Sequence, residues 1–209
     1  MKTDGLIFDL DGTLWDASAA CILAWNNTLQ QYGFNDFRVD QSLIARFSGR
    51  LLEDILAEHF KSILPEQYER FVKLYTAEEA IQMKTFGGTP FPKAKTVLGK
   101  LALTYPLFIV SNCQKGYIEN FLELHDLEKF FTDFECSGNT GLPKRNNIQA
   151  LINRNDLRNP IYIGDTQGDY EASAWNAIPF VYAAYGFGKP VRFDAEISQL
   201  SELVNLLEG

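Results

Sequence analysis

The chain has 209 residues, 46% of them hydrophobic and 22% charged, proportions that are typical of a folded globular protein and exclude a disordered one. Its formal net charge of -8 excludes a broad basic surface for nucleic acid or anionic membrane, so we expect neither as a partner. No apolar run reaches membrane-spanning length, and three scattered cysteines without close pairing favour reduced thiols. We therefore expect a cytoplasmic protein.

Short apolar runs that do not alternate with polar residues indicate strands covered on both faces. These runs lie at 6–8, 107–110, 161–163 and 180–183, with a weaker candidate at 134–136. Segments with helical spacing of apolar residues lie between and after them, around 97–102, 118–122 and 200–207. The alternation predicts an α/β fold, a three-layer, doubly wound parallel sheet.

The segment at 17–84 differs from the rest of the chain because it has helical patterns and no convincing apolar strand. Glycines and prolines follow it, at Gly87, Gly88, Pro90 and Pro92, and such residues mark a hinge or a re-entry into a core. We therefore expect an α/β catalytic core formed by residues 1–16 and 85–209, with an all-helical insertion at 17–84.

Polar side chains follow three of the predicted strands. Asp9 and Asp11 follow the first strand, Ser111 and Asn112 the second, and Asp165 the third. Because ligands of open parallel sheets bind beyond the carboxyl ends of the strands, we expect these side chains to converge on one crevice.

Four carboxylates would then lie close together, those of Asp9, Asp11, Asp165 and Asp169. Such crowding is costly unless a cation neutralises it. Oxygen ligands without a His or Cys cluster favour Mg²⁺. Lys144, at the start of a predicted helix, could add a positive charge, and carboxylates, a hard cation and an ammonium group together suit phosphoryl transfer.

Four motifs resemble those of the haloacid dehalogenase-like phosphatase superfamily. They are DLDGT from Asp9 to Thr13, Ser111-Asn112, Lys144, and the segment from Gly164 to Asp169. The resemblance covers nearly the whole chain and implies a Rossmann-like core with the insertion as a helical cap. The loop from Tyr185 to Gly188 resembles one found in phosphoglycolate phosphatase-like members.

The resemblance implies a role for each acid. Asp9 would attack phosphorus and become an aspartyl phosphate, and Asp11 would protonate the leaving oxygen and then activate water. Mg²⁺ would be held by Asp9, the backbone carbonyl of Asp11 and Asp165, with Asp169 ordering a bound water or a ligand. The substrate would be a small phosphorylated metabolite, either phosphoglycolate-like or a sugar phosphate.

The resemblance also implies contacts to the substrate. Ser111 and Lys144 would hold the phosphoryl oxygens, and Thr13 and Asn112 would lie beside them. Gly49-Arg50 resembles the cap loop that faces the active site, where Arg50 could bind a carboxylate or a second phosphate.

Several alternatives stay open at the level of sequence. Asp11 favours a phosphatase or a β-phosphoglucomutase-type phosphomutase over a dehalogenase, because a halide leaves without a proton. A binding protein on a retired enzyme scaffold is a third possibility, although all the motif acids are present. Ser111-Asn112 could be a helix cap, Arg145 competes with Lys144, Arg50 could be a surface charge, and the oligomeric state is open.

Overall fold

A six-stranded sheet, parallel throughout, forms the centre of the molecule in a computed structural model that describes residues 2–208. The strand order is β5-β4-β1-β6-β7-β8. The strands are β1 (Gly5–Phe8), β4 (Leu107–Ser111), β5 (Phe131–Cys136), β6 (Pro160–Gly164), β7 (Phe180–Ala183) and β8 (Ala195–Ile197). This sheet confirms the doubly wound α/β prediction. Of its strands, only β8, a three-residue edge strand, was not predicted, because its apolar pattern is too short to recognise.

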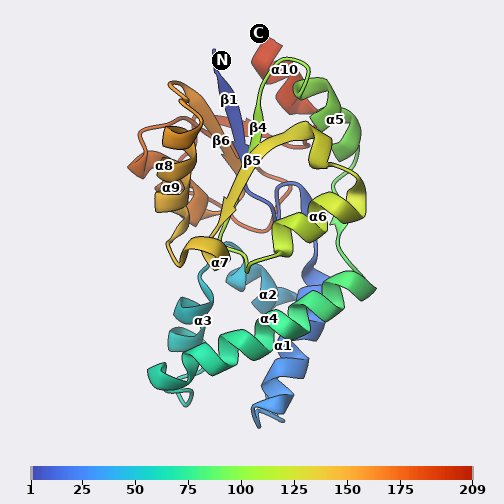
Figure 1. Ribbon diagram of the computed structural model, residues 1–209, viewed down its shortest axis with the longest axis vertical. Coiled ribbons are helices and arrows are strands. Elements are labelled where there is room, and N and C mark those ends of the chain that lie inside the picture. The colour runs from blue at the N-terminus through green and yellow to red at the C-terminus, as the bar shows by residue number, and fades with distance from the viewer. Residues whose placement is uncertain (1, 209) are drawn as a thin grey trace.

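Helices cover both faces of the sheet, which makes three layers (Figure 1). Alternating side chains of the strands pack against them. Leu6 and Phe8 of β1 contact one hydrophobic cluster, and Ile7 contacts another on the opposite face. The helices on the first face are α5 (Ala94–Leu101), α6 (Tyr117–His125) and α10 (Glu202–Glu208). Those on the second face are α8 (Lys144–Arg154) and α9 (Gln167–Trp175).

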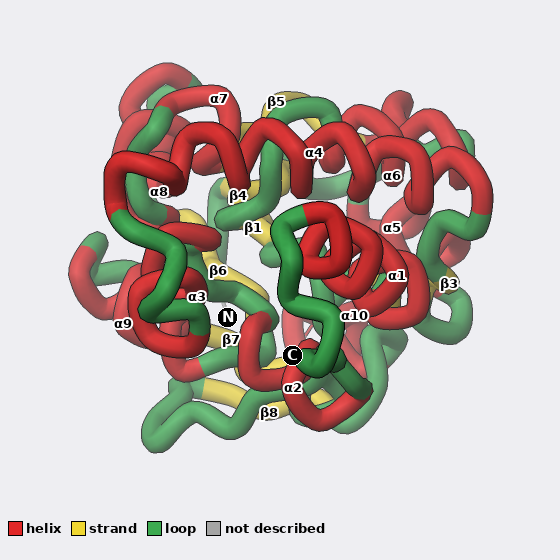
Figure 2. Tube along the Cα trace, turned by 90° about the horizontal axis from the view of Figure 1, so that it is seen from below, coloured by secondary structure: helices red, strands yellow, loops and turns green. Residues whose placement is uncertain are grey.

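Four further helices form a unit with a hydrophobic cluster of its own, which includes the buried rings of Trp25, Phe60 and Phe71. They are α1 (Ser18–Gln31), α2 (Gln41–Phe47), α3 (Leu52–His59) and α4 (Tyr68–Thr85). Long stretches of α1 and α4 pack against each other. Viewed from below, these helices lie in front of the sheet, over the carboxyl ends of its strands (Figure 2).

The chain leaves the sheet for this helical unit and returns beside the same point. β2 (Trp15–Asp16) pairs antiparallel with β3 (Thr89–Pro90). Gly88 allows this approach, because a Cβ there would lie 2.6 Å from the ring of Trp15. The two crossing segments therefore meet in a small ribbon next to the first strand-end loop.

The remaining elements are short. They are α7 (Ser137–Thr140) and two 3₁₀ turns, Pro65–Gln67 and Glu128–Phe130. Among residues 2–208, no helix combines the length and the apolar character needed to cross a membrane.

Candidate active site

Three aspartates meet at the carboxyl edge of the sheet. Asp9 follows β1, Asp165 follows β6, and Asp169 lies in the first turn of α9. Each offers a carboxylate oxygen, and these oxygens lie within 4.8 Å of one another. All three side chains are buried, with at most 1% of each residue exposed. The topology thus brings together residues that lie about 160 positions apart in the chain.

Lys144 connects two of these acids. It is the first residue of α8, and its Nζ lies 2.8 Å from Oδ1 of Asp9 and 2.5 Å from Oδ1 of Asp169. Burial alone would lower the pKa of this ammonium, but the charges of Asp169 and Asp9 outweigh it and raise the pKa. The neighbouring Arg145 instead lies over the ring of Trp175, 5.9 Å from its centroid.

One lysine does not compensate three buried carboxylates. Burial and the charge of Asp169 raise the pKa of Asp9 well above its ordinary value, although Lys144 opposes this. The same two causes raise the pKa of Asp165 to about 7. A cation between them would reverse these shifts. The oxygen-only, buried donor set of Asp9, Asp165 and Asp169 therefore fits a hard divalent ion such as Mg²⁺.

Two glycines permit the close packing around Asp165. Gly12 has φ of 82°, and a Cβ there would lie 2.4 Å from Oδ2 of Asp165; a Cβ on Gly186 would lie 2.4 Å from the Cβ of Asp165. Oδ2 of Asp165 accepts hydrogen bonds from the backbone N–H groups of Phe187, at 2.7 Å, and Gly188, at 3.2 Å. The loop after β7 thus fixes the orientation of this carboxylate.

Local hydrogen bonds also orient Asp169. Its Oδ2 accepts from the backbone N–H groups of Thr166 and Asp165, at 2.9 and 3.1 Å, while the hydroxyl of Thr166 caps α9. Oδ1 accepts from Lys144 and, at 3.4 Å, from the hydroxyl of Tyr162. Asp169 is therefore held mainly by its own helix terminus.

Asp11 lies beside these acids, and its Oδ1 accepts hydrogen bonds from the Tyr117 hydroxyl, at 2.8 Å, and the Trp15 indole N–H, at 3.0 Å. Within residues 2–208, its Oδ2 has no hydrogen-bond donor, so this oxygen can meet a ligand. Burial raises the pKa of Asp11 to about 6, against the opposing effect of these two donors. A carboxyl with such a pKa can exchange a proton near neutral pH.

Ser111 and Asn112 have different surroundings. Ser111 is 4% exposed and borders a pocket between the sheet and the helical unit, and its hydroxyl forms no hydrogen bond with residues 2–208. Asn112 is occupied by protein partners: Oδ1 accepts from the Ser137 hydroxyl and from the backbone N–H of Lys144, and Nδ2 donates to the carbonyl of Gly49, at 2.8 Å. It therefore links the core to the loop between α2 and α3.

The other two residues expected to contact substrate, Thr13 and Arg50, have protein partners of their own. Thr13 is fully buried, and its hydroxyl lies 3.4 Å from Oδ1 of Asp165. Arg50 borders the pocket, but its guanidinium forms an ion pair with Glu58 at 2.7 Å.

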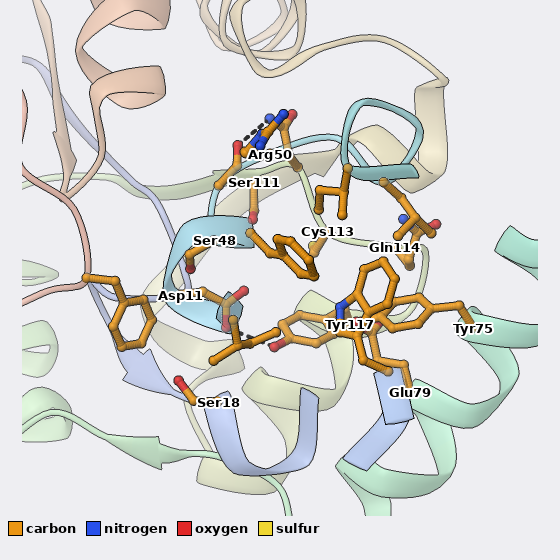
Figure 3. Close-up of a pocket in the computed structure, with 18 of the residues that line it drawn as sticks. Asp11, Ser18, Ser48, Arg50, Tyr75, Glu79, Ser111, Cys113, Gln114 and Tyr117 are labelled. Atoms are coloured by element: carbon orange, nitrogen blue, oxygen red, sulfur yellow. Dashed lines mark hydrogen bonds between the residues drawn. The ribbon is translucent and has the colours of Figure 1, made fainter. Parts of the chain in front are cut away.

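The pocket extends from Asp9 and Asp11 into the helical unit (Figure 3). Its apolar wall comes from α1 to α4, and its polar groups come from both the unit and the sheet loops. The apolar part includes Trp25, Ile44, Phe47, Leu52, Ile55 and Tyr75. The polar part includes Ser18, Ser48, Arg50, Glu79, Ser111, Asn112 and Gln114.

Three residues of the site could not be found from the motifs. Trp15 lies four positions after Asp11, and the loop turns so that its indole N–H contacts that carboxylate. In the sequence, however, a tryptophan at this position indicates a core residue. Tyr117 and Glu79 lie on helices, and nothing in their local sequence separates them from packing or surface residues. Only the three-dimensional arrangement places Tyr117 and Glu79 at the pocket and Trp15 against Asp11.

Comparison with known proteins agrees with this fold. Residues 6–183 match the haloacid dehalogenase-like hydrolase family, and the chain belongs to that family. It is 26% identical over 219 residues to a phosphoglycolate phosphatase of Aquifex aeolicus, covering 98% of this chain and 96% of the relative. A phosphoglycolate phosphatase of Rhodobacter capsulatus is 27% identical over 221 residues, with the same shares covered.

Solved structures show the same fold. A haloacid dehalogenase-like hydrolase from Bacteroides fragilis superimposes with a TM-score of 0.86 at 23% identity, covering 97% of this chain and all of that one. A family protein from Streptococcus pneumoniae gives a TM-score of 0.82 at 23% identity and covers 98% of both chains.

Proposed function

We propose that this chain is a magnesium-dependent phosphatase that hydrolyses a small phosphomonoester through an aspartyl phosphate on Asp9. The observation that carries the proposal is the position of Asp9: it contacts Lys144 beside two further buried carboxylates, while Asp11 lies next to it with a free oxygen and a raised pKa. The family and the phosphatases among its relatives support hydrolysis of a phosphate ester.

In the first step, a carboxylate oxygen of Asp9 attacks phosphorus, and the bond from phosphorus to the ester oxygen breaks. Lys144 orients Asp9 and favours its ionised form through its contact with Oδ1. Asp11, protonated, gives its proton to the departing alkoxide. Tyr117 and Trp15 hold Asp11 in place for this transfer through the opposite oxygen.

In the second step, Asp11, now a carboxylate, takes a proton from a water molecule, whose oxygen attacks phosphorus. The acyl phosphate bond breaks, and Asp9 and inorganic phosphate are released. The free hydroxyl of Ser111 and the ammonium of Lys144 hold the phosphoryl oxygens in both steps.

Asp9 and Asp165, with the carbonyl of Asp11 and with Asp169, would hold Mg²⁺. The ion would shield the nucleophile from the negative substrate and stabilise the transferring oxygens. Thr13 positions Asp165 through their contact and acts only indirectly on the substrate. Asn112 acts by tying the Gly49 loop to the site.

We further propose that residues 17–84 act as a cap over the core of 1–16 and 85–209. The helical cluster separate from the core supports this division, and so does the pocket shared between cap and core. A cytoplasmic location and the absence of nucleic-acid and membrane partners remain predictions from charge and composition. A contact of Arg50 with a substrate carboxylate also stays a prediction, and the ion pair with Glu58 weighs against it.

The test is phosphate release from a panel of phosphomonoesters, with and without Mg²⁺, by the wild type and by Asp9→Asn. Asp16→Asn is a control, because Asp16 accepts a hydrogen bond from the backbone N–H of Ser18 and lies outside the acid cluster. We expect Mg²⁺-dependent release that is lost only in Asp9→Asn. Equal release by Asp9→Asn would contradict the proposal, and an isomerised product without free phosphate would favour the phosphomutase.

A further inference from the structure

Glu79 is a buried acid in the pocket that the proposed reaction does not use. It lies on α4 and is 7% exposed. It forms no ion pair with a Lys, Arg or His of residues 2–208. Its protein partner is Tyr75, one helical turn earlier, through a hydrogen bond. Burying a carboxyl group without a cation lowers the stability of the fold. Packing alone therefore does not explain why an acid occupies this position.

The proposed reaction indicates which part of the substrate Glu79 would contact. Tyr117 contacts Asp11 through its hydroxyl and lies between Asp11 and Glu79 (Figure 3). Asp11 protonates the ester oxygen in the proposed mechanism, so atoms of the leaving group beyond that oxygen extend into this part of the pocket. Glu79 therefore borders the leaving group and not the phosphate.

Two neutral hydroxyl groups without partners in the described part of the chain also border the pocket. Ser18, 7% exposed, and Ser48 both border the pocket, and neither hydroxyl has a hydrogen-bond partner among residues 2–208. Burial raises the pKa of Glu79 to about 8, so its carboxyl is mostly protonated at neutral pH and can donate as well as accept. Unpaired hydroxyls and a neutral acid suit a ligand with several hydroxyl groups.

A carboxylate on the leaving group would find no unpaired basic residue among the described residues that line this pocket. Among the described lining residues, Arg50 is the basic one, and Glu58 already neutralises it at 2.7 Å. Lys84 and Lys115 border a second pocket between α4 and α6, on which Glu79 also lies, and they are not among the residues that line the first. A leaving group with a negative charge would therefore meet no unpaired cation among the described residues in this part of the pocket, because Asp11 and Glu79 are acids.

We propose that Glu79 is a specificity-determining residue that hydrogen-bonds a hydroxyl of the leaving group, and that the substrate is the phosphomonoester of a neutral polyol. This inference rests on the proposed phosphatase function and names the class of its substrate. Trp25 and Tyr75 supply the apolar surface against which the carbon skeleton of such a polyol packs.

The test compares kcat/KM for three esters: glycerol phosphate, phosphoglycolate and phosphoethanolamine, whose leaving groups are neutral, anionic and cationic. The wild type is measured with Glu79→Leu, which removes the polar group, and Glu79→Gln, which keeps a donor and an acceptor. Glu78→Gln is a matched control, because Glu78 lies outside the pocket and binds Asn27 and Gln82. The melting temperature of each variant shows whether it folds.

We expect the wild type to prefer glycerol phosphate. Glu79→Leu should lower kcat/KM for this ester roughly tenfold, the effect of one buried hydrogen bond, and leave phosphoglycolate unchanged. Glu79→Gln and Glu78→Gln should stay within about threefold of the wild type.

Three results would overturn the inference. One is a preference of the wild type for phosphoglycolate, and another is a preference for phosphoethanolamine, which would make Glu79 the partner of a cation. The third is an equal loss of kcat/KM on all three esters in Glu79→Leu. Release of phosphate from none of many esters by the folded wild type would instead overturn the proposed function, and this inference with it.

Discussion

At the scale of single residues, Lys144 shows how the site balances its charges. It lies between Asp9 and Asp169 and is 3% exposed. Replacement of one member of a buried charge group leaves the others uncompensated. We expect Lys144→Met to lower the free energy of unfolding by about 3–5 kcal/mol and to abolish phosphate release. Urea unfolding of the metal-free protein measures the first effect.

Arg145→Met provides the control for that experiment, because Arg145 lies on Trp175 outside the site. It should change stability by less than about 1 kcal/mol. An equal loss in both variants would show that Lys144 has no special part in balancing the acids.

Glu79 should make stability depend on pH. Its pKa is about 8 in the fold against an ordinary value of 4.5. Between these values the folded state keeps a proton that the unfolded state has released, so stability falls as pH rises through this window. Glu79→Gln should lack this contribution and gain a few kcal/mol, to order of magnitude, by about pH 8. Urea unfolding across the window checks this; the same slope in wild type and variant would refute it.

At the scale of elements, the loop after β1 depends on Gly12. Its φ is 82°, and a Cβ at this position would lie only 2.4 Å from Oδ2 of Asp165, which leaves no room for alanine. We expect Gly12→Ala to cost more than about 2 kcal/mol and to weaken Mg²⁺ binding, as measured by unfolding and calorimetry.

Gly33 separates backbone strain from the steric clash. It has φ of 89°, and a Cβ there would meet nothing within 4 Å. Gly33→Ala should therefore cost only about 1 kcal/mol and leave Mg²⁺ binding intact. Similar losses in Gly12→Ala and Gly33→Ala would mean that the packing on Asp165 is unimportant.

The elements also show which features of the fold and the site could be predicted from the sequence. The ends of β1, β4 and β6 were predictable, because unbroken apolar runs followed by Asp or Ser mark buried parallel strands. The contacts of Tyr117 with Asp11 and of Asn112 with Gly49 were not, because they join separate helices and loops across the fold. Glu79 reads in sequence as an ordinary helix acid, and only its burial against the pocket distinguishes it.

At the scale of the whole molecule, folding and metal binding should be linked. The three buried aspartates lie on segments that only the native fold brings together, so Mg²⁺ should bind the folded state in preference. We expect Mg²⁺ to raise the melting temperature, with about 2.7 kcal/mol of stabilisation when free Mg²⁺ is about one hundred times Kd. Asp165→Asn should remove most of this gain. A melting temperature that Mg²⁺ leaves unchanged would contradict the assigned metal site.

The most direct test of the account is to look for the phosphoryl group on Asp9. The enzyme is mixed with a substrate ester and Mg²⁺, quenched in acid during turnover, and digested for peptide mass spectrometry. Asp11→Asn lacks both the acid that protonates the alkoxide and the base that activates water, so it should accumulate the intermediate from an ester whose leaving group needs no proton. We predict a phosphorylated peptide with the modification at Asp9, absent from Asp9→Asn. Turnover with no phosphoryl group on Asp9, or with the group on another residue, would contradict the account.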